Sequence, residues 1–449
     1  PHITQACGGY FLGIDDSDVE YAGKFEAACK QSGVWCEQIS TNDLLKVEPN
    51  ANSNTKMVYR VKDAYIDPFL LTVYNAYDAQ LQGATIRTYC EAIALLQKSN
   101  AITGVKIYDK IRNKTEEISA KMVVNATGPW AARLEKGLNL PSPLQIAPTK
   151  GVLLVIKPRL VNALLNRLSP PGDGDIIVPS HQSILLGTTS IPVTESDLDT
   201  LMPTPLEIEE LLNYGEKLIP TLRKHRIIRF YAGARPLIAS QGDPREASRK
   251  FDIIDYESLG HPGLITIFGG KMTTYRLMAE QTVDLICQKL GITAKCVTAE
   301  TTLPGGDRPI TAHDFRALLH VDDKAAGEMA LKWGTFYEEM QQLCQTCTDG
   351  YAALGQPRMI CECENVSEPE LAWVYQNLHP AVLDDYRRRT RQGMGPCQGQ
   401  YCFFKLANLE AKWTTKSHAQ LMAELQTALH KRWKTEAAAD AMLQRQIKL

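Results

Sequence analysis

The first part of this chain alternates between strand-like and helix-like patterns of apolar positions. Residues 9–14 predict a strand, and residues 25–32 predict a short helix that ends at Gly33. Asp67 followed by Pro68 is typical of a helix start, because the carboxylate caps free N–H groups and proline needs no donor there. The apolar positions that follow at helical spacing are Leu70, Tyr74, Tyr77 and Leu81.

Short β-strands are expected after this helix. Apolar runs predict strands over residues 84–89, 92–97, 102–108 and 117–125. A helix that leads into a small meander, and then into the apolar strand at Val123, is an α/β pattern.

From Gly151 onward the pattern is mainly that of β-structure. Strands are predicted over residues 151–156, 175–178, 183–187, 227–231, 251–256 and 264–268. One helix interrupts them at the capping box of Thr204 and Glu207, with an apolar face of Ile208, Leu211, Leu212, Leu218 and Ile219. A last helix over residues 274–290 is predicted to bury the stripe Ala279, Val283, Ile286 and Leu290.

The Pro- and Gly-rich residues 303–309 are the strongest linker signal in the chain. We therefore expect a core over residues 1–300, with an α/β part (about 1–150 and 257–300) and an antiparallel β part (about 151–256). Beyond it we expect a linker and helical segment over residues 301–355, a cysteine-rich domain over 356–410 and a helical tail over 411–449.

Charge and composition narrow the functional classes. The formal net charge is −2, which argues against a nucleic-acid-binding protein, because such proteins carry a basic excess. No apolar run approaches the ~18 residues that predict a membrane-spanning helix. The chain opens at Pro1 with neither an initiator Met nor a secretory signal, so we expect that it begins inside a longer protein.

Six of the twelve cysteines fall between Cys344 and Cys402. Four of them form two close pairs, Cys361-Glu-Cys363 and Cys397-Gln-Gly-Gln-Tyr-Cys402, with thirty-three residues between the pairs. Two pairs of thiolates are what a [2Fe–2S] cluster requires, one pair for each iron. Structural zinc and unliganded thiols are the alternatives, although zinc ligand pairs favour two to four intervening residues.

Neighbouring residues bear on this cysteine site. Glycines at 393, 395 and 399 would let backbone N–H groups approach sulfur closely. Arginines at 387, 388, 389 and 391 either stabilise an anionic cluster or form a solvated helix face. Cys344 and Cys347 form a competing pair, which the surrounding apolar spacing favours as part of an ordinary helix.

Two strand-to-helix turns are candidates for binding a dinucleotide. Val123-Val-Asn-Ala-Thr-Gly-Pro-Trp130 has small residues that let backbone amides lie against a ligand, although taken alone it is more typical of a plain tight turn. Gly269-Gly-Lys-Met-Thr-Thr-Tyr-Arg276 leads into a helix N-terminus, whose free N–H groups suit a flavin edge that gains negative charge. Arg235 ends a predicted strand and offers a planar fork for phosphate or carboxylate, or for a surface ion pair.

These motifs carry a family resemblance. Ile360-Cys-Glu-Cys-Glu-Asn365 with Arg388-Arg-Thr-Arg-Gln-Gly-Met-Gly-Pro-Cys-Gln-Gly-Gln-Tyr-Cys402 resembles the bacterioferritin-associated-ferredoxin-like [2Fe–2S] domain, which is fused to several flavin dehydrogenases. The order Asn125-Ala-Thr-Gly, Pro148-Thr-Lys-Gly, Gly187-Thr-Thr, Gly233-Ala-Arg-Pro-Leu and Gly269-Gly-Lys resembles FAD-dependent glycerol-3-phosphate dehydrogenases of the D-amino-acid-oxidase-like class. Together they resemble the A subunits of anaerobic glycerol-3-phosphate dehydrogenases over essentially the whole chain.

The resemblance implies an α/β fold with three parts: the remainder of a Rossmann-like FAD-binding domain, an antiparallel β-sheet substrate domain and a small helical [2Fe–2S] domain. It implies that Arg235 and Lys271 face the substrate. The cluster ligands that it implies are Cys361, Cys363, Cys397 and Cys402. The FAD-binding residues that it implies are Ala126, Thr127, Gly128, Trp130, Gly269, Gly270, Lys271, Met272, Thr273 and Thr274.

A G-x-G-x-x-G motif, which would bind the FAD pyrophosphate at a helix N-terminus, does not occur in this sequence. The resemblance implies that roughly ninety residues containing this motif precede Pro1. Without them we expect the chain alone to bind FAD weakly and to turn over poorly.

The implied reaction is oxidation of sn-glycerol 3-phosphate to dihydroxyacetone phosphate by hydride transfer to FAD. Electrons would leave through the cluster toward further dehydrogenase subunits (a second flavoprotein and an iron–sulfur membrane anchor) and then a quinone, in a cytoplasmic protein held at the inner membrane by these partners. His181 and His225 are candidates for the general base. The alternatives are a flavin/[2Fe–2S] dehydrogenase for an amino acid or 2-hydroxy acid, and a non-catalytic electron-relay or scaffold protein.

Overall fold

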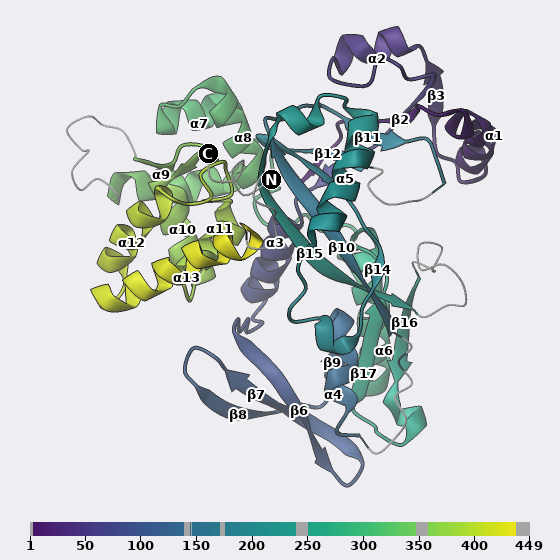
Figure 1. The fold of residues 1–449 in the computed structure, drawn as a ribbon. Helices are drawn as coiled ribbons and strands as arrows, with labels where there is room; N and C mark the ends of the chain where they lie inside the picture. Colours follow the sequence, from purple (N-terminus) through teal and green to yellow (C-terminus); the bar gives the residue numbers. More distant parts are fainter. Residues whose placement is uncertain are drawn as a thin grey trace.

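The computed structural model describes residues 3–138, 144, 146–170, 176–238, 250–346 and 358–436 (Figure 1). A long twisted sheet forms the centre of the molecule, smaller sheets lie at one end of it, and the C-terminal helices gather beside it. The α/β fold expected from the sequence is confirmed, as is the helical C-terminal region.

The largest sheet has nine strands. Its order is β14 (Ile191–Pro192), β10 (Ile146–Lys157), β13 (Ser183–Gly187), β12 (Ile176–Ser180), β11 (Leu164–Arg167), β2 (Gly9–Gly13), β4 (Met57–Val61) and β3 (Cys36–Ile39), and β15 (Arg226–Ile238) also pairs with β10. Neighbouring strands are antiparallel except β11 and β2. Three of these strands come from the first 61 residues, so the sheet crosses the boundary expected near residue 150, and the division into domains stays a prediction.

The main core under this sheet follows the predicted periodicity. Val152, Leu154 and Ile156 alternate along β10 and are fully buried against α5 (Pro205–Leu218). The predicted apolar face of α5 is buried throughout, and each such side chain contributes roughly 1.5–3 kcal/mol. The capping box is confirmed, since the Glu207 N–H donates to Thr204 Oγ1 at 3.3 Å.

Smaller elements surround the large sheet. The strands are β1 (Thr4–Gln5) paired with β5 (Tyr65–Ile66), the meander β6 (Cys90–Lys98), β7 (Ala101–Asp109) and β8 (Lys114–Ser119), and the sheet β16 (Phe251–Asp255), β17 (Leu264–Gly269) and β9 (Val123–Asn125). The helices here are α1 (Asp16–Gln31), α2 (Thr41–Val47), α3 (Pro68–Leu81), α4 (Ala131–Glu135) and α6 (Tyr275–Leu290). Asp67 caps α3 as predicted, with Oδ1 accepting from the Phe69 and Leu70 N–H groups.

Several predicted elements are wrong in extent. Residues 84–89 form no strand, because the meander begins at the pair Cys90–Asp109 and leaves the earlier run without a partner. The strand expected over 117–125 is divided into β8 and β9, and the helix expected over 25–32 begins at Asp16. Leu81, expected on the inner face of α3, is 58% exposed.

The buried stripe predicted for α6 is also wrong. Val283 and Leu290 are 52% and 38% exposed, Ala279 is exposed, and Ile286 is half-buried. Thr282 is the fully buried position of the helix. The described part of the chain leaves most of this apolar face uncovered, so helical periodicity alone did not identify the packed side.

The C-terminal region is a helical assembly with its own core. Its elements are α7 (Ala312–Leu319), α8 (Asp323–Trp333), α9 (Tyr337–Thr346), the pair β18 (Met359–Cys361) and β19 (Val366–Ser367), α10 (Glu368–Leu378), α11 (Leu383–Thr390), α12 (Cys402–Trp413) and α13 (His418–Glu436). Trp333 and Trp373 are buried and meet edge to face, and Tyr74 of α3 joins the same core. None of the helices described is long and apolar enough to cross a bilayer.

Candidate functional site

The two glycine-containing turns singled out in the sequence lie at one edge of a small sheet. β9 and β17 are parallel neighbours, with Val123 opposite Leu264 and Asn125 opposite Thr266. Carboxyl ends of parallel strands meet at the same sheet edge, so the turns that follow them are adjacent. The predicted FAD contacts at residues 126–130 and 269–274 are thereby brought together.

The first turn is held by a buried asparagine. Asn125 is 1% exposed, and its amide donates to the Ala131 carbonyl at 3.0 Å while its oxygen accepts from Thr127 Oγ1 at 2.7 Å. Gly128 has φ +60°, which favours glycine, and open space where a Cβ would stand. Trp130 is turned toward Asp199, to which its indole N–H donates at 3.0 Å.

The second turn brings backbone close to its surroundings. Gly269 and Gly270 have φ +80° and +71°, and a Cβ on Gly270 would lie 2.4 Å from Met278 Sδ. The exposed Lys271 follows, and its N–H donates to Thr274 Oγ1 at 3.1 Å. Lys271 and Thr274 line a cavity of about 500 Å³ ahead of α6.

Arg235 is fixed by the connection between β13 and β14. Its Nη1 donates to the Thr189 carbonyl at 2.9 Å, and its Nη2 donates to Thr188 Oγ1 at 2.8 Å. Gly151 provides the room, because a Cβ there would lie 2.5 Å from Arg235 Nη2. The hydroxyl of Thr149, which pairs with Arg235 across the strands, is buried without a hydrogen-bond partner among the described residues. A fixed guanidinium and an unused hydroxyl suit a polar ligand.

The end of β15 lies at the edge formed by the two turns. β15 contacts both β17 and the short 3₁₀-helix Gly128–Trp130. A Cβ on Gly269 would lie 3.1 Å from the side chain of Ile238, the last residue of β15. We call the turns at 126–130 and 269–274, together with the end of β15 at Arg235, the turn edge.

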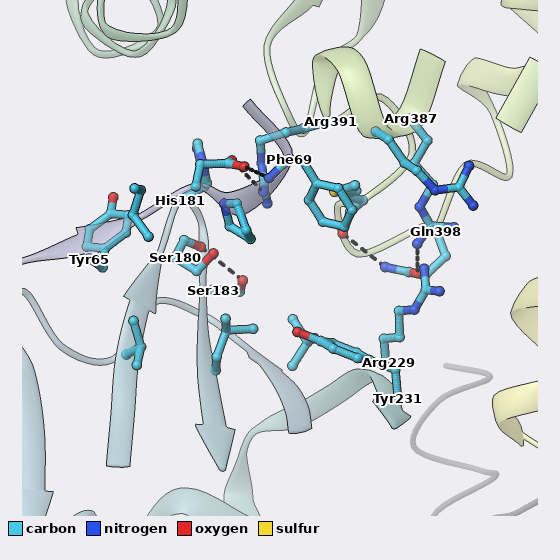
Figure 2. A pocket seen from close by; sticks show the side chains of 18 of the residues that line it. Tyr65, Phe69, Ser180, His181, Ser183, Arg229, Tyr231, Arg387, Arg391 and Gln398 are labelled. Atoms are coloured by element: carbon cyan, nitrogen blue, oxygen red, sulfur yellow. Dashed lines mark hydrogen bonds and ion pairs between the residues drawn. The ribbon is translucent and has the colours of Figure 1, made fainter. Parts of the chain in front are cut away.

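Neither candidate base lies beside Arg235. His225 immediately precedes β15, and ten residues of strand span about 33 Å. His181 instead pairs with Asp67, Nε2 to Oδ2 at 3.4 Å, in a different cavity (Figure 2). Burial and the charge of Arg391 lower the pKa of His181, so the imidazole is neutral near pH 7.

The structure brings the four predicted cysteines together as a chain of contacts. The Sγ atoms of Cys361 and Cys363 are 3.8 Å apart, Cys402 contacts Cys361, and Cys397 contacts Cys363. Cys361 and Cys402 are each 2% exposed. Among the residues that the structure describes, no three His, Cys, Asp or Glu side chains surround a point as a single metal ion requires. The thiols therefore converge as pairs rather than around one centre.

Backbone around these sulfurs is closely packed. A Cβ on Gly395 would lie 2.5 Å from Cys363 Sγ, so only glycine leaves the space. Contact with Cys363 and backbone N–H groups lower the pKa of Cys361, whereas contact with Cys361 raises the pKa of Cys363. Four thiols so close cannot all lose their protons without a cation among them. We call residues 361–364 and 391–402 the cysteine loops.

The arginines beside the cysteine loops differ in exposure. The Arg388 side chain is 46% exposed, as expected for a solvated face. Arg387 is 5% exposed and donates to Gln398 Oε1 at 3.2 Å. The Arg391 side chain is 12% exposed and bridges Glu364 at 3.0 Å and Asp67 at 3.4 Å. Cys344 is half-buried in α9, as expected for an ordinary helix residue, while Cys347 lies outside the described residues.

Comparison with known proteins gives these arrangements a family. Residues 1–276 match the model of the DAO family, described as FAD dependent oxidoreductase. The chain belongs to the FAD-dependent oxidoreductases. It is 35% identical, over 96% of its length and 78% of the relative's, to the A subunit of the anaerobic glycerol-3-phosphate dehydrogenase of Escherichia coli K12. The A1 subunit of the Haloferax volcanii enzyme is 32% identical over 98% of this chain and 74% of its own. The chain thus groups with the A subunits, as the motifs indicated.

A solved structure has the same fold. The glycerol-3-phosphate dehydrogenase of Bacillus halodurans complexed with FAD superposes with a TM-score of 0.73 at 22% identity, covering 97% of this chain and 82% of that one. This match supports the fold of both the sheet and the C-terminal helices.

Proposed function

We propose that this oxidoreductase converts sn-glycerol 3-phosphate to dihydroxyacetone phosphate at FAD bound along the turn edge. The observation that carries the proposal is that β15, which bears Arg235 held by Thr188 and Thr189, contacts both β17 and the short helix of the first glycine turn. The names of the A-subunit relatives support glycerol 3-phosphate as the substrate.

The turn edge suits a flavin dinucleotide. The proposed contacts are Ala126, Thr127, Gly128 and Trp130 from the first turn and Gly269, Gly270, Lys271, Met272, Thr273 and Thr274 from the second. Positive φ at Gly128, Gly269 and Gly270 keeps the backbone free of side chains where a planar ring would approach. FAD, when bound, supplies the hydride acceptor.

The chain's own residues bind and orient the substrate. Arg235 offers its guanidinium fork to the phosphate or to the C2 oxygen, and its hydrogen bonds to neighbouring strands reduce the entropy lost on binding. Lys271 places a positive charge where negative charge develops as the C2 hydroxyl loses its proton.

We further propose that the cysteine loops hold a [2Fe–2S] cluster through Cys361, Cys363, Cys397 and Cys402. Four thiols joined in a chain of contacts could supply two ligands for each iron, and Gly395 leaves space beside sulfur. The cluster would accept single electrons and pass them to further dehydrogenase subunits, a second flavoprotein and an iron–sulfur membrane anchor, and then to a quinone. Association with the inner membrane would then come from these partners.

Anaerobic reduction of the flavoprotein, isolated with its cofactors, tests the activity. Glycerol 3-phosphate should bleach the flavin absorbance in a single turnover, while an amino acid or 2-hydroxy acid should not. Arg235→Gln should slow this reduction about 10²- to 10³-fold, the usual cost of one transition-state hydrogen-bond donor, and Arg235→Lys should restore part of it. Faster bleaching by an amino acid or hydroxy acid would reassign the substrate. Protein that shows cluster absorbance without flavin would instead support an electron-relay function.

A further inference from the structure

A second cavity, of about 270 Å³, lies between the large sheet and the C-terminal helices. The sheet contributes Arg229 and Tyr231 of β15, and the helical region contributes Arg387 of α11 and Gln398 of the cysteine loops (Figure 2). Neither Arg235 nor Lys271 lines it. Arg235 is four residues beyond Tyr231, about 13 Å along the strand, so this cavity is separate from the turn edge.

The lining of this cavity is strongly basic. Its cations are Arg229, Arg387, Arg388, Arg391 and Lys431, against the two carboxylates Asp67 and Asp384. Arg388 and Lys431 share Asp384, and Arg391 pairs with Asp67. Arg388 also pairs with Asp385 at 3.8 Å, so these three cations have three carboxylate partners and the excess of positive charge falls on the remaining two arginines.

Arg229 and Arg387 have no carboxylate partner among the residues that the structure describes. Arg387 is 5% exposed and donates to the neutral amide of Gln398 at 3.2 Å. Arg229 is half-buried and makes neither a hydrogen bond nor an ion pair within the described ranges. Burial lowers its pKa, and the opposing charge of Asp384 does not offset this. Burying a guanidinium without an ion-pair partner is costly, and a bound anion would reduce that cost.

The two arginines that form no ion pair among the described residues point to the same place. Figure 2 shows Arg229 rising from the sheet and Arg387 descending from the helix toward Gln398. Two planar forks around one point match the several oxygens of one phosphate better than two carboxylates set apart on a carbon chain. Phe69, Val155, Val178 and Leu185 form an apolar wall that suits a small carbon skeleton.

We propose that this cavity binds a small phosphate monoester dianion through Arg229 and Arg387, at a site separate from the substrate site. The ligand would bridge β15 and α11, because one arginine comes from each. α13 also contacts β15, and α11 contacts α3, so an anion here would stabilise the docking of the cysteine-containing region on the sheet.

Calorimetric titration in an Arg235→Gln background separates this site from the proposed substrate site. Glycerol 3-phosphate and inorganic phosphate should each bind one site there, and adding Arg229→Gln or Arg387→Gln should weaken binding about 10- to 100-fold, the loss expected for a hydrogen-bonded charge. Lys224→Gln, which removes an exposed charge just before β15, is the matched control and should leave binding unchanged.

Two results would overturn the site. One is equal phosphate binding with and without Arg229 and Arg387, with all variants unfolding at the wild-type temperature. The other is succinate binding as tightly as glycerol 3-phosphate, which would reject the phosphate class. Because the readout is binding rather than flavin reduction, failure here leaves the proposed oxidation untouched, and failure of that reaction leaves this site untouched.

Discussion

The turn edge and the cysteine loops differ in whether backbone or side-chain atoms form their surface. At the turn edge, backbone with positive φ at Gly128, Gly269 and Gly270 forms the surface, and Lys271 is exposed. In the cysteine loops, buried side chains converge, and Cys361 and Cys402 are each 2% exposed. The proposed FAD would lie against backbone in the first region, and the proposed cluster would be enclosed by side chains in the second.

The surroundings differ in the same way. The hydrogen bonds described for Arg235 go to the Thr189 carbonyl and the Thr188 hydroxyl. The cysteine loops lie in a network of buried charges, including Arg391 with Glu364 and the nearby pair Lys332–Glu370 at 2.6 Å. Removing one partner of a buried ion pair strongly destabilises the protein, because the other charge stays buried without compensation. Substitutions should therefore alter activity at the turn edge and stability or metal content around the cysteines.

Replacing one cysteine tests the second region with the largest expected effect. Cys397→Ser should remove the iron and the electron paramagnetic resonance signal of the reduced protein, because a cluster with three thiolates loses one ligand of an iron. Cys344→Ser, in a half-buried helix position, is the matched control and should keep both. Unchanged iron in anaerobically prepared Cys397→Ser would reject these ligands.

Breaking the buried ion pair beside the cysteine region should cost the most stability. Glu370 is fully buried and also accepts from Ser367 N–H and from the Trp333 indole. Lys332→Met should lower the free energy of unfolding by about 3–5 kcal/mol, because a buried carboxylate loses its cation. Denaturant unfolding followed by tryptophan fluorescence measures this.

Lys46→Met provides the comparison, since Lys46 and Asp43 pair at 2.7 Å with side chains 73% and 56% exposed. Exposed pairs contribute about 0–1 kcal/mol. If the two variants lost the same free energy of unfolding, the buried ion pair of Lys332 and Glu370 would contribute no more to stability than an exposed pair.

The sequence predicts both regions because each depends on local signals. The cysteine pairs are recognisable from residue type and spacing, and the two glycine turns follow apolar strands that prove to be neighbours. Their exact geometry depends on more distant residues. Gly151 stands out in the sequence only as part of a motif, and its importance to Arg235 arises from the pairing of β10 with β15.

Tertiary packing decides what the sequence could not. Arg229 and Arg387 are 158 positions apart and meet only because α11 and α13 pack beside the sheet, so no local pattern indicates their cavity. Periodicity on α6 wrongly predicted a buried stripe, since helical spacing identifies an apolar face without saying what covers it.

A pair of glycines on adjacent strands tests the turn edge. Gly151→Ala would place a Cβ 2.5 Å from Arg235 Nη2 and displace the guanidinium. We expect flavin reduction by glycerol 3-phosphate to slow about 10²-fold, as small misplacements of binding groups often do. Gly233→Ala, directly opposite Gly151, meets nothing within 4 Å and should react at the wild-type rate. Similar rates for the two variants would remove Arg235 from the substrate site.

The contact between α3 and the cysteine loops should depend on pH through Asp67, which caps α3 and contacts His181 and Arg391. Burial alone would raise the pKa of Asp67, but the hydrogen bond from His181 and the charge of Arg391 outweigh it and lower the pKa to about 2. A carboxylate with a depressed folded-state pKa stabilises the protein above its unfolded value of 3.8, and that contribution is lost as the pH falls toward 2. The contribution at pH 7 is therefore about 2 kcal/mol.

Asp67→Asn isolates this effect, because asparagine still caps a helix but cannot carry the charge. It should lower the free energy of unfolding by about 2 kcal/mol at pH 7 and by about half as much at pH 3. At pH 3, Asp67 is protonated in most unfolded wild-type molecules but still charged in the folded protein. Asp16→Asn, at a side chain that is 90% exposed, should show no such change with pH. A cost for Asp67→Asn that stays constant from pH 7 to pH 3 would mean that hydrogen-bond geometry, and not charge, connects α3 to the cysteine loops.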